Sequence, residues 1–434
     1  MRGNVRNETN GDGESFLRKR GPNSAGREAN VGAGSPMSRR RSAASIETDE
    51  RLLDAALDEL AAVGIDRMGM IGVARRAGLT TGALYGRYEN VQELAADVWR
   101  SRIRAPMFAL LNDAVDALVD GGDPKALIRV LEVLKEPSRE VASGIELMVC
   151  ARRIDEVEEL IAPEVDRWMR QRRASARARD QRARAQVLFG VGAVAGMLLH
   201  GIPGARLTNW EPVLANIATS FARAYEPSGS RFTPARLRAV RSKAGDPHQD
   251  ALIDAVAAIT ARVGFERATA SRIARRANLT SGAIYARYDT KDDLLTDAVD
   301  VLLAQRFADD LTDNAHLLDA PDAGTGAASI IGGYLGAPRR DWRIFRVEAQ
   351  LASRYRPELA AALDRVQEFG IRAHVDTLRS SSRASDETLD RMARFNHAMP
   401  LGLAFVDIAL PGAASVDWRS IFVPLLTQAP KPSG

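Results

Sequence analysis

The chain has 434 residues, a formal net charge of +4 and a single cysteine, Cys150. Its length exceeds that of one typical domain, and one cysteine excludes an intramolecular disulfide, which fits a reducing compartment. The mild positive charge permits contact with nucleic acid but does not by itself indicate it. The apolar neighbours of Cys150 favour a core position over a redox role.

Residues 1–45 are rich in Gly, Asn, Ser, Glu and Arg and poor in apolar residues. This composition predicts a disordered tail, and its polar, Gly-rich start does not resemble a secretory signal. The tail ends in a basic arm, Ser38 to Ser42, with three consecutive arginines. Such an arm could reach phosphates or the minor groove of DNA, or it could simply be solvated.

The first folded element, residues 52–63, has a counterpart at residues 252–263. In both, apolar residues recur at spacings of three and four, which predicts an amphipathic helix. Gly64 and Gly264 follow these helices, at the position where a left-handed residue commonly ends a helix.

The sequences of residues 73–88 and 273–288 are near-copies, VARRAGLTTGALYGRY and IARRANLTSGAIYARY, identical at 11 of 16 positions. A repeat at a fixed offset indicates two copies of one module. Gly78 and Asn278, which best tolerate a left-handed backbone, predict a tight turn between a second and a third short helix. Thr80 and Thr280 are placed to cap the third helix. Helix, short turn and helix form a helix-turn-helix pattern.

The third helix is lined with small residues, which let a helix backbone lie deep in the major groove. Tyr and Arg at its end suit phosphate oxygens. Neither copy has an Arg, Asn or Gln placed for bidentate base contacts, so hydroxyl groups, the thymine methyl and groove shape would supply specificity. The residues predicted to contact DNA are Thr80, Thr81, Gly82, Ala83, Tyr85 and Arg87 in the first copy, and Ser271, Thr280, Ser281, Gly282, Ala283, Tyr285, Arg287 and Lys291 in the second.

This arrangement resembles the TetR family of bacterial transcription regulators. The matching residues are the run Ala-x-x-Ala-Gly-Leu-Thr-x-Gly-x-Leu-Tyr-x-x-Tyr at 74–88, its repeat at 274–288, and Lys-Asp-Asp-Leu at 291–294. The resemblance implies an all-α fold of two tandem units, each a DNA-binding head with a helical body for ligand binding and dimerisation. It also implies a cytoplasmic repressor that binds a double-stranded operator and is released by a small effector. No phosphate-binding loop, nucleophile elbow or metal-ligand spacing favours an enzyme, a cofactor or a metal.

The two heads are not equivalent in sequence. In the second copy, polar residues such as Ser271 stand at the start of the second helix. The first copy has Ile71 and two glycines there, and their side chains cannot make the same hydrogen bonds. The resemblance places a phosphate-contacting lysine at Lys291, where the first copy has Val91. We therefore predict that the second head binds DNA more strongly.

The chain divides into six predicted segments, whose bodies are mainly helical. They are the tail (1–45), first head (46–95), first body (96–225), linker (226–248), second head (249–295) and second body (296–428). The linker contains five basic residues between Arg231 and Lys243, which could form a second basic arm.

Residues 185–205 carry no Asp, Glu, Lys or Arg, and this run is long enough to span a membrane. Its glycines and proline, and the presence of Asp407 in the apparent counterpart at 399–414, favour a buried helix at a packing interface instead. Phe189, Gly196 and Trp210 correspond, within an insertion or two, to Phe395, Gly402 and Trp418, which indicates that the duplication covers whole subunits.

A tandem chain could pair its own bodies as a covalent pseudo-dimer on an imperfect palindrome, or two chains could form a homodimer that presents four heads. The resemblance implies a pocket for a hydrophobic effector, although the same residues also suit a simple core. The candidate lining residues are Met148, Trp168, Phe189, Met197, His200, Trp342, Phe345, Tyr355, Phe395, His397 and Met399. The alternative function is an architectural or protein-interaction factor with one degenerate head and weak DNA binding.

Overall fold

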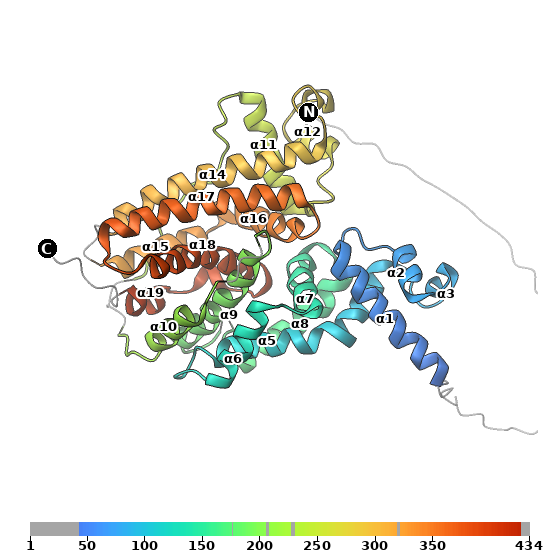
Figure 1. The fold of residues 1–434 in the computed structure, drawn as a ribbon, viewed down its shortest axis with the longest axis horizontal. Coiled ribbons are helices and arrows are strands. Elements are labelled where there is room, and N and C mark those ends of the chain that lie inside the picture. Colours follow the sequence, from blue (N-terminus) through green and yellow to red (C-terminus); the bar gives the residue numbers. More distant parts are fainter. Residues whose placement is uncertain (1–42, 176, 205–207, 227–230, 319–321, 427–434) are drawn as a thin grey trace, which may run out of the picture. The chain divides into compact units, whose positions relative to one another are not determined.

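A computed structural model describes residues 43–175, 177–204, 208–226, 231–318 and 322–426 (Figure 1). Every regular element in these ranges is a helix, which confirms the predicted all-α class. The predicted basic arm at 38–42 and nearly all of the predicted tail lie outside the described residues. The first helix already includes Ala43, a few residues before the predicted start of the first head.

Each head has three helices and the start of a fourth. They are α1 (Ala43–Val63), α2 (Met70–Ala77), α3 (Thr81–Tyr85) and α4 (Val91–Val98) in the first head, and α11 (Pro247–Val263), α12 (Ala270–Arg276), α13 (Ser281–Tyr285) and α14 (Lys291–Leu318) in the second. Gly64 and Gly264 end α1 and α11 with φ of 78° and 85°, and Gly78 and Asn278 have φ of 64° and 58°. The predicted positive φ angles are therefore present in both copies.

Each body contains further helices that follow directly from its head. The first body contains α5 (Arg104–Asp116), α6 (Pro124–Lys135), α7 (Arg139–Cys150), α8 (Asp155–Gln171), α9 (Gln181–Gly201) and α10 (Glu211–Phe221). The second contains most of α14, then α15 (Ala323–Tyr334), α16 (Arg340–Ser353), α17 (Pro357–Ser381), α18 (Asp386–Ala409) and α19 (Arg419–Leu426).

The backbones of α9 and α18, from different halves of the chain, touch each other (Figure 1). A Cβ atom at Gly402 would lie 2.6 Å from the carbonyl carbon of Gly192 and 2.8 Å from the nitrogen of Gly196. Only glycine fits such an approach. Helices α10 and α19 pack beside them, so two helices from each half meet.

Helix α9 contains most of the apolar run at 185–205. It is long and apolar enough to cross a membrane, but most of it is buried inside the protein. The prediction of a buried packing helix agrees with this placement.

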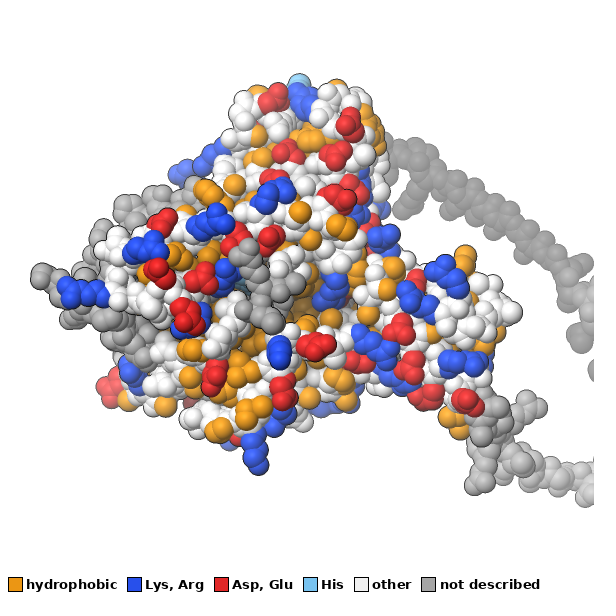
Figure 2. Space-filling model, viewed as in Figure 1, with side chains coloured by type: hydrophobic (Ala, Val, Ile, Leu, Met, Phe, Trp, Pro, Cys, Tyr) orange, Lys and Arg blue, Asp and Glu red, His pale blue; other side chains and the backbone are white. Residues whose placement is uncertain are grey.

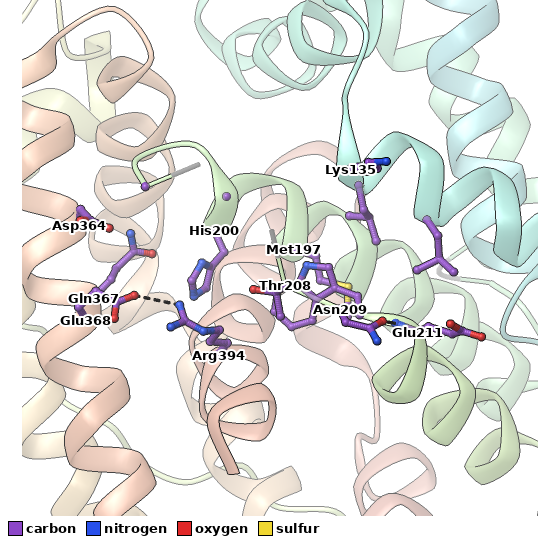
Figure 3. Close-up of a pocket in the computed structure, with 15 residues that line it drawn as sticks. Lys135, Met197, His200, Thr208, Asn209, Glu211, Asp364, Gln367, Glu368 and Arg394 are labelled. Carbon is purple, nitrogen blue, oxygen red and sulfur yellow. Dashed lines mark hydrogen bonds and ion pairs between the residues drawn. The ribbon is translucent and has the colours of Figure 1, made fainter. Parts of the chain in front are cut away.

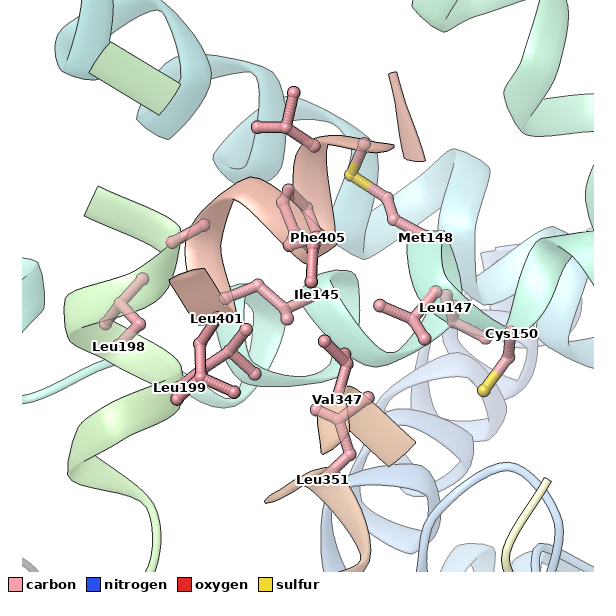
Figure 4. Close-up of a cluster of buried hydrophobic side chains, with 14 of the residues drawn as sticks. Ile145, Leu147, Met148, Cys150, Leu198, Leu199, Val347, Leu351, Leu401 and Phe405 are labelled. Atoms are coloured by element: carbon pink, nitrogen blue, oxygen red, sulfur yellow. The ribbon is translucent and has the colours of Figure 1, made fainter. Parts of the chain in front are cut away.

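One hydrophobic cluster takes side chains from both halves of the chain. Figure 4 shows residues of α7 and α9, such as Ile145 and Leu199, together with residues of α16 and α18, such as Val347 and Phe405. Cys150 is buried here, and burial raises the pKa of its thiol. The two bodies therefore share a core, and Cys150 is part of it as predicted.

The segment before the second head is anchored along the second half of the chain. Ala235 donates its N–H to the carbonyl of Ser329 at 2.9 Å, and the hydroxyl of Ser329 donates to the carbonyl of Thr233 at 3.0 Å. Closer to the second head, Arg241 pairs with Asp254 on α11 at 3.3 Å. The backbone of this part of the linker and Arg241 have partners on α15 and α11, while its basic side chains are exposed, so the second basic arm stays a prediction.

Candidate nucleic-acid interface

The third helix of each head presents small and aromatic side chains to solvent. In α3, Thr81 and Gly82 are exposed while Leu84 is buried in the head core. Tyr85 is 59% exposed, and Tyr285 is 57% exposed in the second head. Large aromatic side chains at matched exposed positions suit a surface that contacts another molecule.

The predicted caps of the third helices differ between the heads. The hydroxyl of Thr80 accepts a hydrogen bond from the Ala83 N–H at 3.2 Å, as predicted. Thr280 makes no side-chain cap, so the prediction is wrong for the second head. The N–H of Ala283 donates to the Thr280 carbonyl at 3.0 Å, as the N–H of Ala83 does to the Thr80 carbonyl, so this backbone bond is common to both heads.

Two residues after the third helix fix its position within the head. Arg87 donates to Asp49 at 3.0 Å, and Arg287 pairs with Asp246 at 3.2 Å. The hydroxyl of Tyr88 donates to Asp97 at 3.0 Å, and Tyr288 makes the equivalent bond. Both arginines remain at the surface, but a phosphate would have to share them with a carboxylate.

The N-terminus of the second helix is polar in one head only. The Thr269 hydroxyl accepts from the Arg272 N–H at 3.4 Å and lies 3.2 Å from the hydroxyl of Ser271. In the first head, α2 has no side-chain cap and Ile71 is 75% exposed. The predicted inequality therefore has a structural counterpart at this end of the helix.

The first head contains an ion pair between a buried glutamate and an exposed arginine that the sequence did not reveal. Glu59 on α1 fills the space left by Gly72, where a Cβ would lie 2.7 Å from the Glu59 carboxyl carbon, and it accepts a hydrogen bond from Arg76. The second head has Ile259 and Arg272 at the matching positions. One sign of this ion pair was visible in the sequence, which is the acidic Glu59 at a position of α1 where the apolar stripe predicts an apolar residue.

Lys291 and Val91 begin the fourth helices in different ways. The Lys291 ammonium lies 3.5 Å from Asp292 at the surface-facing start of α14, whereas Val91 packs against the head core. We predict that Lys291 makes one phosphate contact, which Val91 cannot make in the first head.

Replacing Lys291 with alanine is expected to weaken binding to every duplex and to reduce the slope of log affinity against log salt by about 0.9. Fluorescence anisotropy at several salt concentrations measures both quantities. Val91→Lys is the matched reverse change and should increase the slope. An unchanged slope in both variants would mean that this position does not contact phosphate.

Positive and negative charges are mixed on one face of the protein. On the face shown in Figure 2, Lys and Arg side chains alternate with Asp and Glu. This face therefore has no general positive field that would attract DNA.

A family model described as bacterial regulatory proteins, tetR family, matches residues 52–98 and 252–298. These ranges coincide with the two helix-turn-helix heads and the start of the fourth helix in each. The chain therefore contains two tandem TetR-type units. It is a DNA-binding transcription regulator. No curated protein matches the chain.

A cavity of about 340 Å³ lies between the two bodies (Figure 3). Met197 and Trp210 supply apolar lining from the first half, and Gln367 and Arg394 supply polar lining from α17 and α18. Gln367 is only 6% exposed, and its side-chain oxygen has no hydrogen-bond partner among the described residues. A buried acceptor of this kind favours a ligand that donates a hydrogen bond.

Most of the predicted pocket residues instead belong to the core. Met148 and Phe345 are buried, and Phe189 packs edge-to-face against Phe395 at 6.5 Å. The indole N–H of Trp168 donates to Asn112 at 2.9 Å.

Of the six main candidates, only Trp342 borders a described cavity, a smaller one of about 200 Å³. Met197 and His200, from the wider set of candidates, do line the larger cavity. Apolar periodicity marks core positions, whereas this cavity arises where two halves meet.

Three histidines lie near this cavity, of which His397 is buried and His200 and His374 are half-buried. Burial lowers the pKa of His200 to about 4, and it also lowers the pKa of His374 and of His397, whose rings are 5.6 Å apart. The positive charges of Arg394 and Arg346 lower the pKa of His200 further, while Glu368 opposes them.

The free energy of unfolding is expected to fall as the pH is lowered from 7 to 5. The unfolded chain protonates its histidines near pH 6.5, while His200 stays neutral in the fold, so the unfolded state binds more protons in this window. His200 alone would contribute about 2 kcal/mol over this range. Urea denaturation at each pH measures the effect. His200→Asn should reduce the dependence and His248→Asn, at an exposed site, should not; equal slopes would contradict the assignment.

Proposed function

We propose that this TetR-family regulator is a repressor that uses its two heads as an internal pair on an imperfect palindrome. The glycine contact between α9 and α18 is the main observation that supports it, because helices of one chain occupy each other's packing surface. The shared core of α7, α9, α16 and α18 supports the same arrangement. Two heads in one chain can then contact half-sites about one DNA turn apart.

Light scattering of the protein, alone and on operator DNA selected from a random library, tests this proposal. One chain per duplex with two protected half-sites is the expected result. Two chains per duplex would overturn the internal pair and favour a four-headed homodimer. A single weak footprint without sequence preference would favour the architectural alternative, which the exposed Ile71 of the first head supports.

The effector of this cytoplasmic repressor would bind in the cavity between the bodies. Its lining combines apolar side chains, including Met197 and Trp210, with the acceptor oxygen of Gln367 and with charged side chains such as Arg394. This combination suits an amphipathic molecule that carries an N–H or O–H donor for Gln367. Because both halves line the cavity, a ligand there would change how the bodies sit together, and hence the separation of the heads.

N-phenyl-1-naphthylamine, a neutral fluorescent probe with a single N–H, tests the cavity. We expect one probe molecule to bind per chain and operator affinity to fall when it binds. Met197→Trp should fill the cavity and abolish probe binding, while Ile128→Trp, at an exposed position of α6, should not. Probe binding that persists in Met197→Trp would place the site elsewhere.

A further inference from the structure

The turns that follow α7 and α16 make corresponding contacts in the two halves. Glu146 on α7 and Glu348 on α16 are both buried, at 5% and 4% exposure. Each is followed seven positions later by a large side chain, Arg153 or Tyr355. In both cases this later side chain crosses to the other half of the chain.

The first crossing joins the second body to the first head. The hydroxyl of Tyr355 donates to one oxygen of Glu146 at 2.6 Å. The other oxygen of Glu146 accepts from the backbone N–H of Ile65 at 2.7 Å. A Cβ at Gly64 would lie 2.8 Å from the Tyr355 ring. The end of α1 is therefore held by its own body and by the opposite body together.

The second crossing joins the first body to the second head. Arg153 donates to Glu348 at 3.2 Å, and a Cβ at Gly264 would lie 2.6 Å from the Arg153 guanidinium carbon. Arg152 bridges the same Glu348 and the carbonyl of Ala261 near the end of α11, both at 2.6 Å. Gly64 and Gly264, which end the first helices of the heads, thus meet corresponding side chains from the opposite bodies.

Asp66 connects the two crossings. It accepts two hydrogen bonds from Arg153, at 2.6 and 2.7 Å, and pairs with Arg267 of the second head at 3.3 Å. Arg153 therefore contacts a loop of the first head and the buried glutamate of the second body at once. Because these charges are buried, separating one pair would leave an unpaired buried charge, which is strongly destabilising. The heads therefore cannot shift slightly without a large cost in free energy.

We propose that Arg153 and Tyr355 are positioning residues that fix the separation of the heads and so select the spacing between DNA half-sites. This role in spacing rests on the proposed internal pairing of the heads. Each head is held to both bodies, so it cannot shift without breaking contacts made by the opposite half. The residues touch no DNA-facing surface of α3 or α13 and would leave the affinity of a single head for one half-site unchanged.

Anisotropy with duplexes whose half-site spacing varies in single base pairs, and with a duplex carrying one half-site, tests the role in DNA recognition. We expect Arg153→Met to lose about tenfold at the best spacing and to flatten the spacing profile. Tyr355→Phe, which keeps the ring against Gly64, should produce a smaller change in the same direction. Arg129→Met, which removes an exposed ion pair with Asp113, is the control. An unchanged profile, or an equal loss on the single half-site, would overturn the proposal.

A distance measurement without DNA separates this proposal from the internal pairing on DNA. Spin labels on cysteines introduced at the matched exposed positions Glu89 and Asp289 report the head separation, while the native Cys150 is buried. We expect a narrow distance distribution in the parent protein and a broad one in Arg153→Met. A distribution that is already broad in the parent protein would show that the contacts of Arg153 and Tyr355 do not fix the separation of the heads. A narrow one, combined with two chains per duplex, would instead reject only the proposed mode of DNA binding.

Discussion

Replacing Gly402 with alanine is expected to lower the free energy of unfolding by roughly 2 kcal/mol, as overpacking of a tight core does. Alanine is the better helix former by about 1 kcal/mol, so propensity alone predicts the opposite sign. The contact decides, because the new methyl would meet the backbone of Gly192 and Gly196. A backbone cannot rotate away as a side chain can, so α9 and α18 would have to move apart. Urea denaturation followed by circular dichroism measures the change.

Gly201→Ala is the matched control for this substitution. Gly201 also lies in α9, but no atom lies within 4 Å of a Cβ built there. It should be neutral or slightly stabilising, as expected for alanine in a helix. If Gly402→Ala were as stable as Gly201→Ala, the close crossing of the two helices would be wrong.

Glutamate at Gly282 is expected to reduce operator affinity about 100-fold, because a carboxylate facing phosphates costs several kcal/mol. The fold should tolerate it: the nearest atom to a Cβ at Gly282 is the Thr280 hydroxyl at 3.6 Å, and a Cβ at Gly82 meets nothing within 4 Å. Gly82→Glu should cost less, about tenfold, if the second head binds more strongly. Anisotropy on the selected operator measures both changes.

Gly282→Gln separates the effect of charge from that of size. It has nearly the same shape as glutamate but no charge, so it should retain most of the affinity. A larger loss for Gly82→Glu than for Gly282→Glu would reverse the predicted ranking of the heads. Unaltered binding in both glutamate variants would show that α3 and α13 are not the DNA-contacting helices.

The features of the heads that depend on local rules were predictable from the sequence. The repeat at a fixed offset identified two copies, and Gly78 and Asn278 indicated a left-handed turn that both heads contain. The stripe of apolar residues predicted α1 and α11, because an amphipathic helix can be recognised from the spacing of apolar residues within one segment of the chain. The contrast between Ile71 and Ser271 was equally visible, because the two positions align directly.

The features that depend on distant residues were not predictable. Arg153 and Glu348 are 195 positions apart, and no local pattern indicates that they meet. The larger cavity similarly combines Met197 with Gln367, from different halves. The Glu59 ion pair required knowing that Gly72 leaves room beside it. Apolar and aromatic residues selected for a pocket, such as Phe189, turned out to fill the shared core for which their spacing is equally suited.

The contact of α9 with α18 joins two unlike halves within one polypeptide. In a dimer of identical chains, every substitution appears on both sides of the symmetry axis. Here each side chain occurs once, so one side can change while the other is held constant. Ala235 and Arg241 hold the segment before the second head against the second half of the chain, and α9 contacts α18 across the two halves. If the proposed internal pairing occurs, a cell that makes two versions of this protein would contain two species and no mixed third one.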